Sequence, residues 1–220
     1  MSDLKPVFIV SAPSGTGKTT LNRMLVKQHP EIEVAVSLTC RPMREGEVNG
    51  RDYEFVSEAE FKRNIEEGNM LEWATVHGYL YGTSKKQLME IQQRDHYSLL
   101  EIDVQGWKTA KEKLKAATAI FILPPSLKEL WVRLEQRGTD SLKTRWKRLV
   151  NAKKEIEAAD DYDFFIINDD VQKAYKELES IIIKGEKGKI NRELGISYCQ
   201  KLLEEFECDS WFQALKKKIT

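Results

Sequence analysis

A run near the start of the chain has the residue types and spacing of a loop that holds phosphate groups. It reads Ser11-Ala12-Pro13-Ser14-Gly15-Thr16-Gly17-Lys18-Thr19-Thr20 and follows an apolar stretch at residues 7–10. This is a Walker A pattern between an expected strand and an expected helix, although Ala12 replaces its usual first glycine. Gly15 and Gly17 let backbone N–H groups face a phosphate. We therefore predict an ATP site over residues 12–20, with Lys18 on the β- and γ-phosphates and Thr19 on Mg²⁺.

A second group of residues has the chemistry of a nucleoside monophosphate site. Arg41 and Arg44 offer planar, charged forks for a phosphate dianion. Guanine presents N1–H and an exocyclic amine side by side, and one carboxylate accepts both, so Glu72 is the predicted reader of the base. Adenine lacks this donor pair and would leave Glu72 unpaired, which discriminates by about 10⁴ or more. The further predicted contacts are Tyr53 and Tyr81 to phosphate, and Ser37, Thr83 and Asp103 to the base.

These segments, taken in order, resemble the guanylate kinase family. The resemblance runs from about Pro6 to Asp170 and rests on several separate motifs. They include residues 37–47, 50–53, 72–73 and 79–83, then Leu100-Glu101-Ile102-Asp103-Val104-Gln105-Gly106, Leu123-Pro124-Pro125-Ser126 and Arg137-Gly138-Thr139-Asp140. It implies a P-loop kinase that uses ATP and Mg²⁺ to phosphorylate GMP in purine nucleotide metabolism, and it assigns the second group of residues to GMP.

The transfer machinery follows from charge and from the same resemblance. Phosphoryl transfer needs positioning and neutralisation of charge, and Lys18 and Arg44 supply part of the positive charge. Arg137 and Arg148 match family positions that close over the transferring group, in a lid with a bend at Gly138. Glu101 and Asp103 end an expected strand, where an acid holds Mg²⁺ through water. The division of metal and guanine roles between these two acids stays open. Asn168 and Asp169 contact adenine by the resemblance or, alternatively, cap a loop.

Two other functions compete with a GMP kinase. The first is a scaffold-type binding module, which keeps the fold and binds phosphopeptides through the acceptor-site arginines but has a damaged phosphate loop. Here Lys18 and Thr19 are intact. The second is a P-loop kinase with another acceptor, such as AMP or a sugar phosphate, and Glu72 with Thr83 argues against it.

The elements that position these residues indicate an α/β fold: a P-loop NTPase core with a parallel sheet flanked by helices, an inserted lobe and a mobile lid. Mostly unbroken apolar runs at residues 7–10, 99–104, 119–123 and 164–167 predict buried parallel strands, with a fifth near 34–36. Capping boxes predict helix starts near Ser57, Ser84 and Ser126. We expect a core at 1–36, 94–130 and 150–184, a GMP-binding lobe at 37–93, a lid at 131–149 and a helical extension at 185–220.

Composition narrows the class of protein. The 35 basic and 35 acidic residues cancel, which argues against a nucleic-acid or membrane partner. Three scattered cysteines predict reduced thiols in a cytoplasmic protein, and no apolar run approaches the length of a membrane span. The residues after Lys184 lie outside the resemblance, with Asp209 as an expected helix cap. They predict helices docked on the core or a subunit contact, and both a monomer and a homodimer stay open. Trp107 and Trp146 stand at unusual positions without an assigned mechanism.

Overall fold

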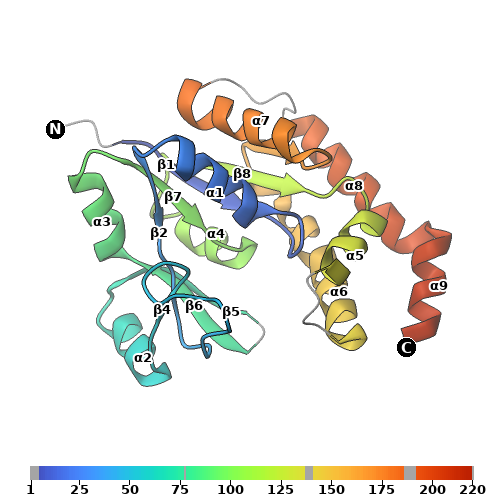
Figure 1. Ribbon diagram of the computed structural model, residues 1–220, viewed down its shortest axis with the longest axis horizontal. Helices are drawn as coiled ribbons and strands as arrows, with labels where there is room; N and C mark the ends of the chain where they lie inside the picture. Colours follow the sequence, from blue (N-terminus) through green and yellow to red (C-terminus); the bar gives the residue numbers. More distant parts are fainter. Residues whose placement is uncertain (1–4, 77, 137–140, 186–191, 220) are drawn as a thin grey trace. The chain divides into compact units, whose positions relative to one another are not determined.

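The computed structural model describes residues 5–76, 78–136, 141–185 and 192–219 (Figure 1). Its strands are β1 (Val7–Ser11), β2 (Ile32–Ala35), β3 (Leu38–Thr39), β4 (Glu54–Phe55), β5 (Met70–Val76), β6 (Tyr79–Ser84), β7 (Tyr97–Glu101), β8 (Thr118–Leu123) and β9 (Phe164–Ile167). Its α-helices are α1 (Lys18–Gln28), α2 (Glu58–Glu66), α3 (Lys85–Gln93), α4 (Val104–Ala110), α5 (Leu127–Gln136), α6 (Leu142–Glu157), α7 (Val171–Lys184), α8 (Arg192–Cys208) and α9 (Ser210–Ile219).

The strands form two sheets. One has the order β2-β7-β1-β8-β9 and the other the order β4-β3-β6-β5. In the first sheet β2 pairs with β7 and β8 with β9, both in parallel. All five apolar runs expected to be strands lie in this sheet, and their side chains are largely buried. The predicted α/β fold with a parallel sheet flanked by helices is confirmed.

One expected strand is shorter than its apolar run. The run at residues 99–104 leaves the sheet after Glu101, so the prediction of a strand through Val104 was wrong. The reason is Asp103, whose side chain accepts the Gly106 N–H over 2.8 Å and caps α4. A side chain that bonds to nearby backbone N–H groups favours a helix start over continued strand pairing. At Asp103 the helix cap forms, and the strand ends before it.

The predicted helix starts are confirmed by the capping bonds themselves. Ser57, Ser84 and Ser126 each accept the backbone N–H three residues ahead, at 3.1, 3.2 and 3.1 Å. Asp209 accepts the N–H groups of Trp211 and Phe212 at the start of α9. These short polar side chains satisfy donors that the first turn of a helix leaves without partners.

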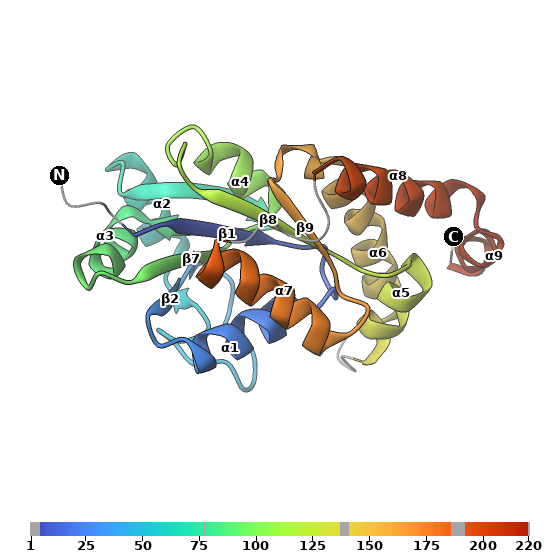
Figure 2. The ribbon, with the colours of Figure 1, turned by 90° about the horizontal axis from the view of Figure 1, so that it is seen from above.

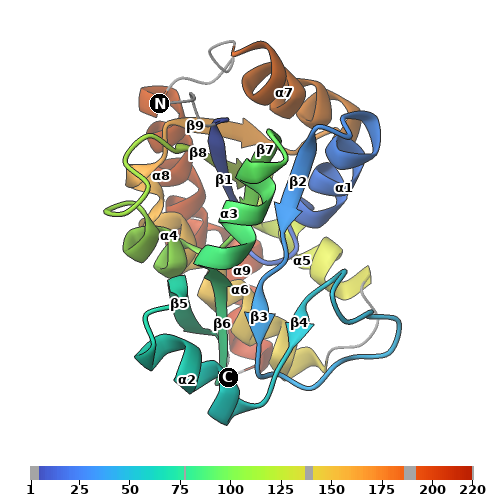
Figure 3. The ribbon, with the colours of Figure 1, turned by 90° about the vertical axis from the view of Figure 1, so that its left-hand side faces the viewer.

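The chain divides into two compact units, and the first comprises Met1–Ile9 and Val26–Thr118. Within it lies the four-stranded sheet, with α2 beside it (Figure 3). Phe61 of α2 is fully buried against Leu38 and Met70 of this sheet. The lobe that carries the predicted acceptor residues therefore has a small apolar core of its own.

The second unit comprises Val10–Leu25 and Ala119–Thr220. In it α7 and α8 lie on opposite sides of β9 (Figure 2). The buried face of α7 consists of Ala174, Leu178, Ile181 and Ile182. The helix is followed by its cap residue Gly185, whose φ is +62°. None of the described helices is long and apolar enough to cross a membrane.

The expected helical extension is present as α8 and α9, and α8 docks through a glycine. A Cβ at Gly195 would lie 2.1 Å from Cδ2 of Phe165 on β9. No side chain tolerates such a distance, so the helix backbone approaches the strand more closely than any other residue type would allow. α8 therefore packs on β9, and a subunit contact, the other predicted role for the tail, stays a prediction.

We expect Gly195→Ala to destabilise the protein despite its gain in helix propensity of about 1 kcal/mol. Forcing a methyl group into this contact costs about 1–3 kcal/mol or more. The packing cost exceeds the gain in helix propensity, so the net effect is a loss of stability. At about 2–4 °C per kcal/mol for a chain of this size, we expect the melting temperature to fall by several degrees. Ser197→Ala, on the exposed side of α8, is the matched control. Differential scanning calorimetry of both variants checks this, and an unchanged or raised melting temperature for Gly195→Ala would contradict the packing argument.

Candidate active site

The loop between β1 and α1 depends on its two glycines. Gly15 and Gly17 have φ angles of +96° and +105°, a region that favours glycine strongly. A Cβ at Gly17 would lie 2.5 Å from Nδ2 of Asn168, and one at Gly15 would lie 2.9 Å from Cδ2 of Leu134. Both positions therefore exclude side chains by conformation and by space, as a loop that wraps a phosphate requires.

The carbonyl of Thr16 is the point at which the rest of the second unit holds this loop. The Asn168 amide donates to it over 2.7 Å, and Nη1 of Arg133 donates over 3.3 Å. Asn168 is only 5% exposed, whereas Asp169 is exposed and accepts the Asp170 N–H. In this structure Asn168 thus supports the phosphate loop from β9, and its predicted contact with adenine stays a prediction.

The remaining residues of the predicted ATP site range from buried to exposed. Pro13 and Thr16 are buried, Ala12, Ser14 and Lys18 are half-buried, and Thr19 and Thr20 are exposed. Lys18 and Thr19 open α1, where the helix dipole favours anions.

The residues predicted for Mg²⁺ fit a hard cation, because a Thr19 hydroxyl and a Glu101 carboxylate both offer oxygen. Thr19 lies in the first turn of α1 and Glu101 ends β7. Among the residues that the structure describes, no group of three or more His, Cys, Asp or Glu side chains gathers as a metal centre. Mg²⁺ in kinases needs no such group, because it keeps several waters and is shared with substrate phosphates.

Glu72 is a buried acid on β5. It is 2% exposed, and its neighbour across the sheet, Thr83 on β6, is fully buried. The Thr83 hydroxyl lies close enough to the carboxyl group to lower its pKa, but Glu72 Oε1 and Thr83 Oγ1 are buried without a well-aligned hydrogen bond to another described residue. Buried polar atoms nearly always have partners, so two such atoms side by side mark a place built for a polar ligand.

The environment of Glu72 changes its acidity. Burial raises the pKa of Glu72 from 4.5 to about 7, Thr83 pulls it back, and the charge of Asp103 adds to the increase. Because the unfolded chain has the lower pKa, the free energy of unfolding falls as the pH rises from about 4.5 through 7. Near neutral pH, the Glu72 carboxyl group of the folded protein can therefore ionise when a ligand supplies hydrogen-bond donors to it.

A glycine on α4 makes room for this carboxyl group. A Cβ at Gly106 would lie 2.6 Å from Oε2 of Glu72, so only glycine leaves the acid its position. Asp103, which caps α4, accepts the Gly106 N–H and is half-buried. Trp107, at the next position, is buried, with 6% exposure.

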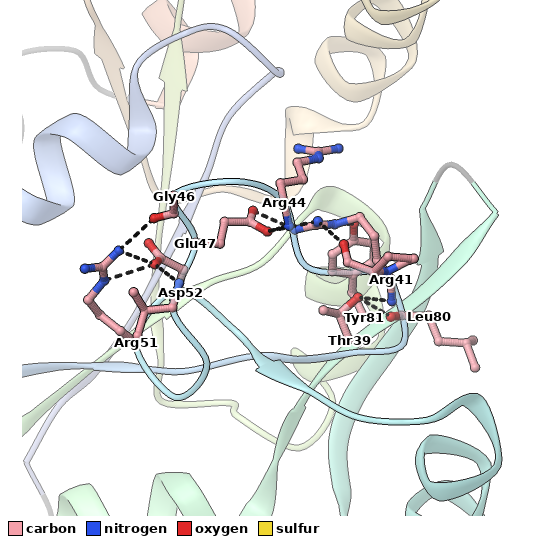
Figure 4. A network of polar contacts seen from close by, with 11 residues as sticks. Thr39, Arg41, Arg44, Gly46, Glu47, Arg51, Asp52, Leu80 and Tyr81 are labelled. Carbon is pink, nitrogen blue, oxygen red and sulfur yellow. Dashed lines mark hydrogen bonds and ion pairs between the residues drawn. The ribbon is translucent and has the colours of Figure 1, made fainter. Parts of the chain in front are cut away.

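Arg41 has most of its hydrogen-bonding capacity engaged (Figure 4). Its Nε donates to the Tyr81 hydroxyl over 3.0 Å, and Nη1 donates to the Pro42 carbonyl over 2.7 Å. Both Nη atoms also bind the Glu47 carboxylate, at 3.0 and 2.8 Å. Four of the five guanidinium N–H groups thus have acceptors within the described residues. In turn, the hydrogen bonds from Arg41 lower the pKa of Glu47.

Arg44 differs from Arg41 although both are predicted phosphate ligands. Arg44 is exposed, and its side chain points away from the Arg41–Glu47 pair (Figure 4). Its backbone N–H joins the network by donating to Glu47 over 2.7 Å. The structure therefore brings Arg41 into a fixed, paired position and leaves the Arg44 guanidinium at the surface.

Tyr53 and Ser37 complete the predicted acceptor residues. The Tyr53 ring meets the Tyr81 ring edge-on at 5.7 Å, and the Arg41 guanidinium lies 5.4 Å from the Tyr53 ring centre. Burial raises the pKa of Tyr53, which keeps its hydroxyl protonated as a donor. Ser37 is half-buried, and its carbonyl accepts the Glu54 N–H over 3.0 Å. Both tyrosines and Arg41 form one cluster, as the prediction of a phosphate grip requires.

Of the two predicted lid arginines, Arg148 lies within the described residues and Arg137 does not. Arg148 is half-buried on α6, whose N-terminus is capped by Ser141. Arg137 and the bend at Gly138 lie outside the described residues. The roles of both arginines in transfer stay predictions.

Comparisons with known proteins agree with this chemistry. Residues 4–185 match the family model described as guanylate kinase. A guanylate kinase of Protochlamydia amoebophila is 48% identical over 177 residues, which are 80% of this chain and 89% of that protein. A guanylate kinase of Clostridioides difficile is 41% identical over 201 residues, which are 91% of this chain and 95% of that protein.

The chain belongs to the guanylate kinase family.

A solved structure supports the same assignment. The crystal structure of guanylate kinase from Anaplasma phagocytophilum aligns with a TM-score of 0.68 and 30% identity, and it covers 94% of this chain and 95% of that chain. The guanylate kinase family model ends at residue 185, so α8 and α9 lie beyond it. The Clostridioides difficile alignment covers 91% of this chain and therefore extends past that residue.

Sequence reasoning missed three residues of this guanylate kinase site. Gly106 carried a usable signal, because a glycine inside a helical pattern often marks a close approach. Glu47 carried none, since an acid in a charged loop is ordinarily solvated. Arg133 lies within the expected lid, residues 131–149, and was given no role of its own, whereas it contacts the phosphate loop through the Thr16 carbonyl.

We expect Arg41→Lys to destabilise the protein and Arg44→Lys to leave its stability unchanged. A lysine at residue 41 loses the two-point contact with Glu47 and the bond to Tyr81. Hydrogen bonds to charged groups contribute about 1.5–3 kcal/mol each, and loss of one lowers the melting temperature by roughly 3–12 °C. Thermal unfolding of the two variants without ligand measures the difference. Equal melting temperatures would mean that the Arg41–Glu47 pair does not hold this loop.

Proposed function

We propose that this chain is a guanylate kinase that transfers the γ-phosphoryl group of ATP to GMP, giving ADP and GDP in purine nucleotide metabolism. The observation that carries the proposal is the buried Glu72 carboxyl, which lies beside Thr83 with an unpaired oxygen on each. Guanine fits this place, since its N1–H and exocyclic amine together supply the donors that a carboxylate requires. Membership of the family supports the same substrate.

The phosphate loop is proposed to bind the donor nucleotide. Backbone N–H groups of residues 12–20 and the N-terminus of α1 bind the phosphates of ATP, and Lys18 neutralises charge on the β- and γ-phosphates. The conformations of Gly15 and Gly17 and the support from Asn168 favour this role. Arg148 and Arg44 are proposed to neutralise the charge that spreads over the transferring group.

The acceptor is proposed to bind through its phosphate and its base. Tyr53, Tyr81, Arg44 and the remaining donor of Arg41 bind the GMP phosphate, while Glu72 orients the guanine. An oxygen of that phosphate attacks the γ-phosphorus in line, and the bond from the γ-phosphorus to ADP breaks. No strong general base is needed, because the attacking phosphate is already ionised. Exclusion of water keeps the γ-phosphoryl group from hydrolysis.

Mg²⁺ is the proposed cofactor, bound with ATP. When bound, it would supply positive charge that neutralises the phosphates of ATP. Thr19 and Glu101 would hold it, directly or through water, together with the phosphates. We also propose residues 37–93 as the acceptor lobe and a cytoplasmic location, in line with an enzyme of soluble nucleotides.

A coupled assay of ADP release with Mg²⁺-ATP tests the proposal, with GMP, AMP, CMP and UMP compared as acceptors. We expect turnover with GMP and a preference over AMP on the order of 10⁴, because adenine would leave Glu72 unpaired. Glu72→Gln should lose most of this preference, since the glutamine amide has a single acceptor oxygen and sets an NH2 donor against one of the two guanine donors. Lys18→Ala should abolish turnover.

Glu66→Gln, an exposed acid on α2, is the matched control and should keep the activity and the preference of the unchanged protein. A folded protein that phosphorylates none of the four acceptors would overturn the proposal. A Glu72→Gln variant that keeps its full preference for GMP would contradict the assignment of the guanine reader.

A further inference from the structure

Aromatic side chains join α5 and α6 to the C-terminal helices. Trp146 of α6 stacks on Phe212 of α9, with ring centres 5.3 Å apart and ring planes 21° apart. Phe212 is 5% exposed and meets Phe206 of α8 edge-on at 5.1 Å. Trp131 of α5 meets Trp211 of α9 at 6.5 Å. Such pairs add to the stabilisation that comes from buried area.

Polar contacts reinforce the same junction. The Arg145 guanidinium lies 5.2 Å from the Trp131 ring centre and forms an ion pair with Glu135. Glu205 of α8 accepts the N–H of Leu127, the first residue of α5, over 2.8 Å. The Tyr198 hydroxyl donates to the Pro125 carbonyl just before α5, over 2.7 Å. The C-terminal helices therefore hold α5 at its start as well as along its length.

The C-terminal helices are themselves fixed in place. Gly195 of α8 packs closely on Phe165 of β9. At the corner between α8 and α9, the Gln213 amide donates to the carbonyls of Phe206 and Glu207, over 3.1 and 2.9 Å, and Asp209 caps α9. The packing of α8 on β9 and the hydrogen bonds at the corner between α8 and α9 therefore fix the position of Phe212.

Helical geometry connects this junction to Arg148. Residues two apart in an α-helix differ by about 200° around the axis, so Trp146 and Arg148 lie on nearly opposite sides of α6. A residue that fixes one side of a helix also fixes the direction of side chains on the other side. The buried residues Leu149, Ala152 and Ile156 hold α6 from the turn of Arg148 onward, and Trp146 lies at the start of that same turn.

We propose that α8 and α9 position α6 for phosphoryl transfer, and that Trp146 and Phe212 are the positioning residues that act through Arg148. The inference rests on the proposed function for the role of Arg148. It assigns a task to the two helices beyond the family model and to the tryptophan that the sequence left unexplained. Small displacements of a group that stabilises the transition state lower kcat, because those interactions form only when the geometry is right.

Steady-state kinetics with Mg²⁺-ATP and GMP test the proposal in the full-length chain, at a temperature where each variant is folded. We expect Phe212→Ala and Trp146→Ala to lower kcat about 10- to 100-fold, with little change in the KM for GMP. Trp146→Phe, which keeps a ring on Phe212, should restore most of kcat. Lys217→Ala, on the exposed side of α9, is the matched control and should behave as the unchanged protein.

Hydrogen exchange followed by mass spectrometry supplies a readout that does not depend on activity. Amides of α6 should exchange faster in Phe212→Ala than in Lys217→Ala, while amides of β8 and β9 should not change. Unchanged exchange in α6 would overturn the proposal, and so would a wild-type kcat in a folded Phe212→Ala enzyme. If the unchanged protein turns over no GMP, the proposed function fails, and the exchange experiment still decides whether the C-terminal helices hold α6.

Discussion

The buried carboxyl of Glu72 is the constraint on which the acceptor half of this protein depends. Taking an acid out of water without a full set of partners costs free energy, and the protein tolerates that cost by shifting the pKa of Glu72 to about 7. The surrounding residues serve this one group. Gly106 leaves space for Oε2, Thr83 places a second unpaired oxygen beside it, and Asp103 caps the helix that carries Gly106. A ligand with two adjacent hydrogen-bond donors offsets the free energy of burying this carboxyl group, and a ligand without them does not.

The phosphate loop and the acceptor loop are organised by different means. Gly15 and Gly17 give the phosphate loop conformations that other residues resist, and Asn168 and Arg133 fix the loop from outside through the Thr16 carbonyl. The acceptor loop is instead organised by charge, with Arg41 bound at two points to Glu47. Glu47 occupies two of the Arg41 donors and so holds the guanidinium, with its remaining donor, in one position before the substrate arrives. Preorganisation of this kind lowers the entropy that binding must overcome.

Much of this organisation could be predicted from the sequence, because it depends on local patterns. The apolar runs that form β1, β8 and β9, the serine caps of α2, α3 and α5, and the phosphate loop all follow from residues near one another in the chain. The end of β7 could not be predicted from apolar character alone, because capping by Asp103 competes with strand pairing. Three features depend instead on tertiary contacts: the support that the Asn168 amide gives to the Thr16 carbonyl, the pairing of Arg41 with Glu47, and the stacking of Trp146 on Phe212. For Asn168 with Thr16 and for Trp146 with Phe212, the partners are also distant in sequence, so no spacing predicts them.

The measurement that tests the central claim most directly is the number of protons released when GMP binds. Isothermal titration calorimetry in buffers of different ionisation enthalpy gives that number, and Glu72→Gln corrects for protons from the GMP phosphate. If GMP binds the ionised carboxylate, the corrected release is about half a proton at pH 7, approaches one at pH 6 and nearly vanishes at pH 8, as a pKa of about 7 requires. Equal proton release by the unchanged protein and Glu72→Gln at every pH would show that Glu72 does not ionise to receive guanine.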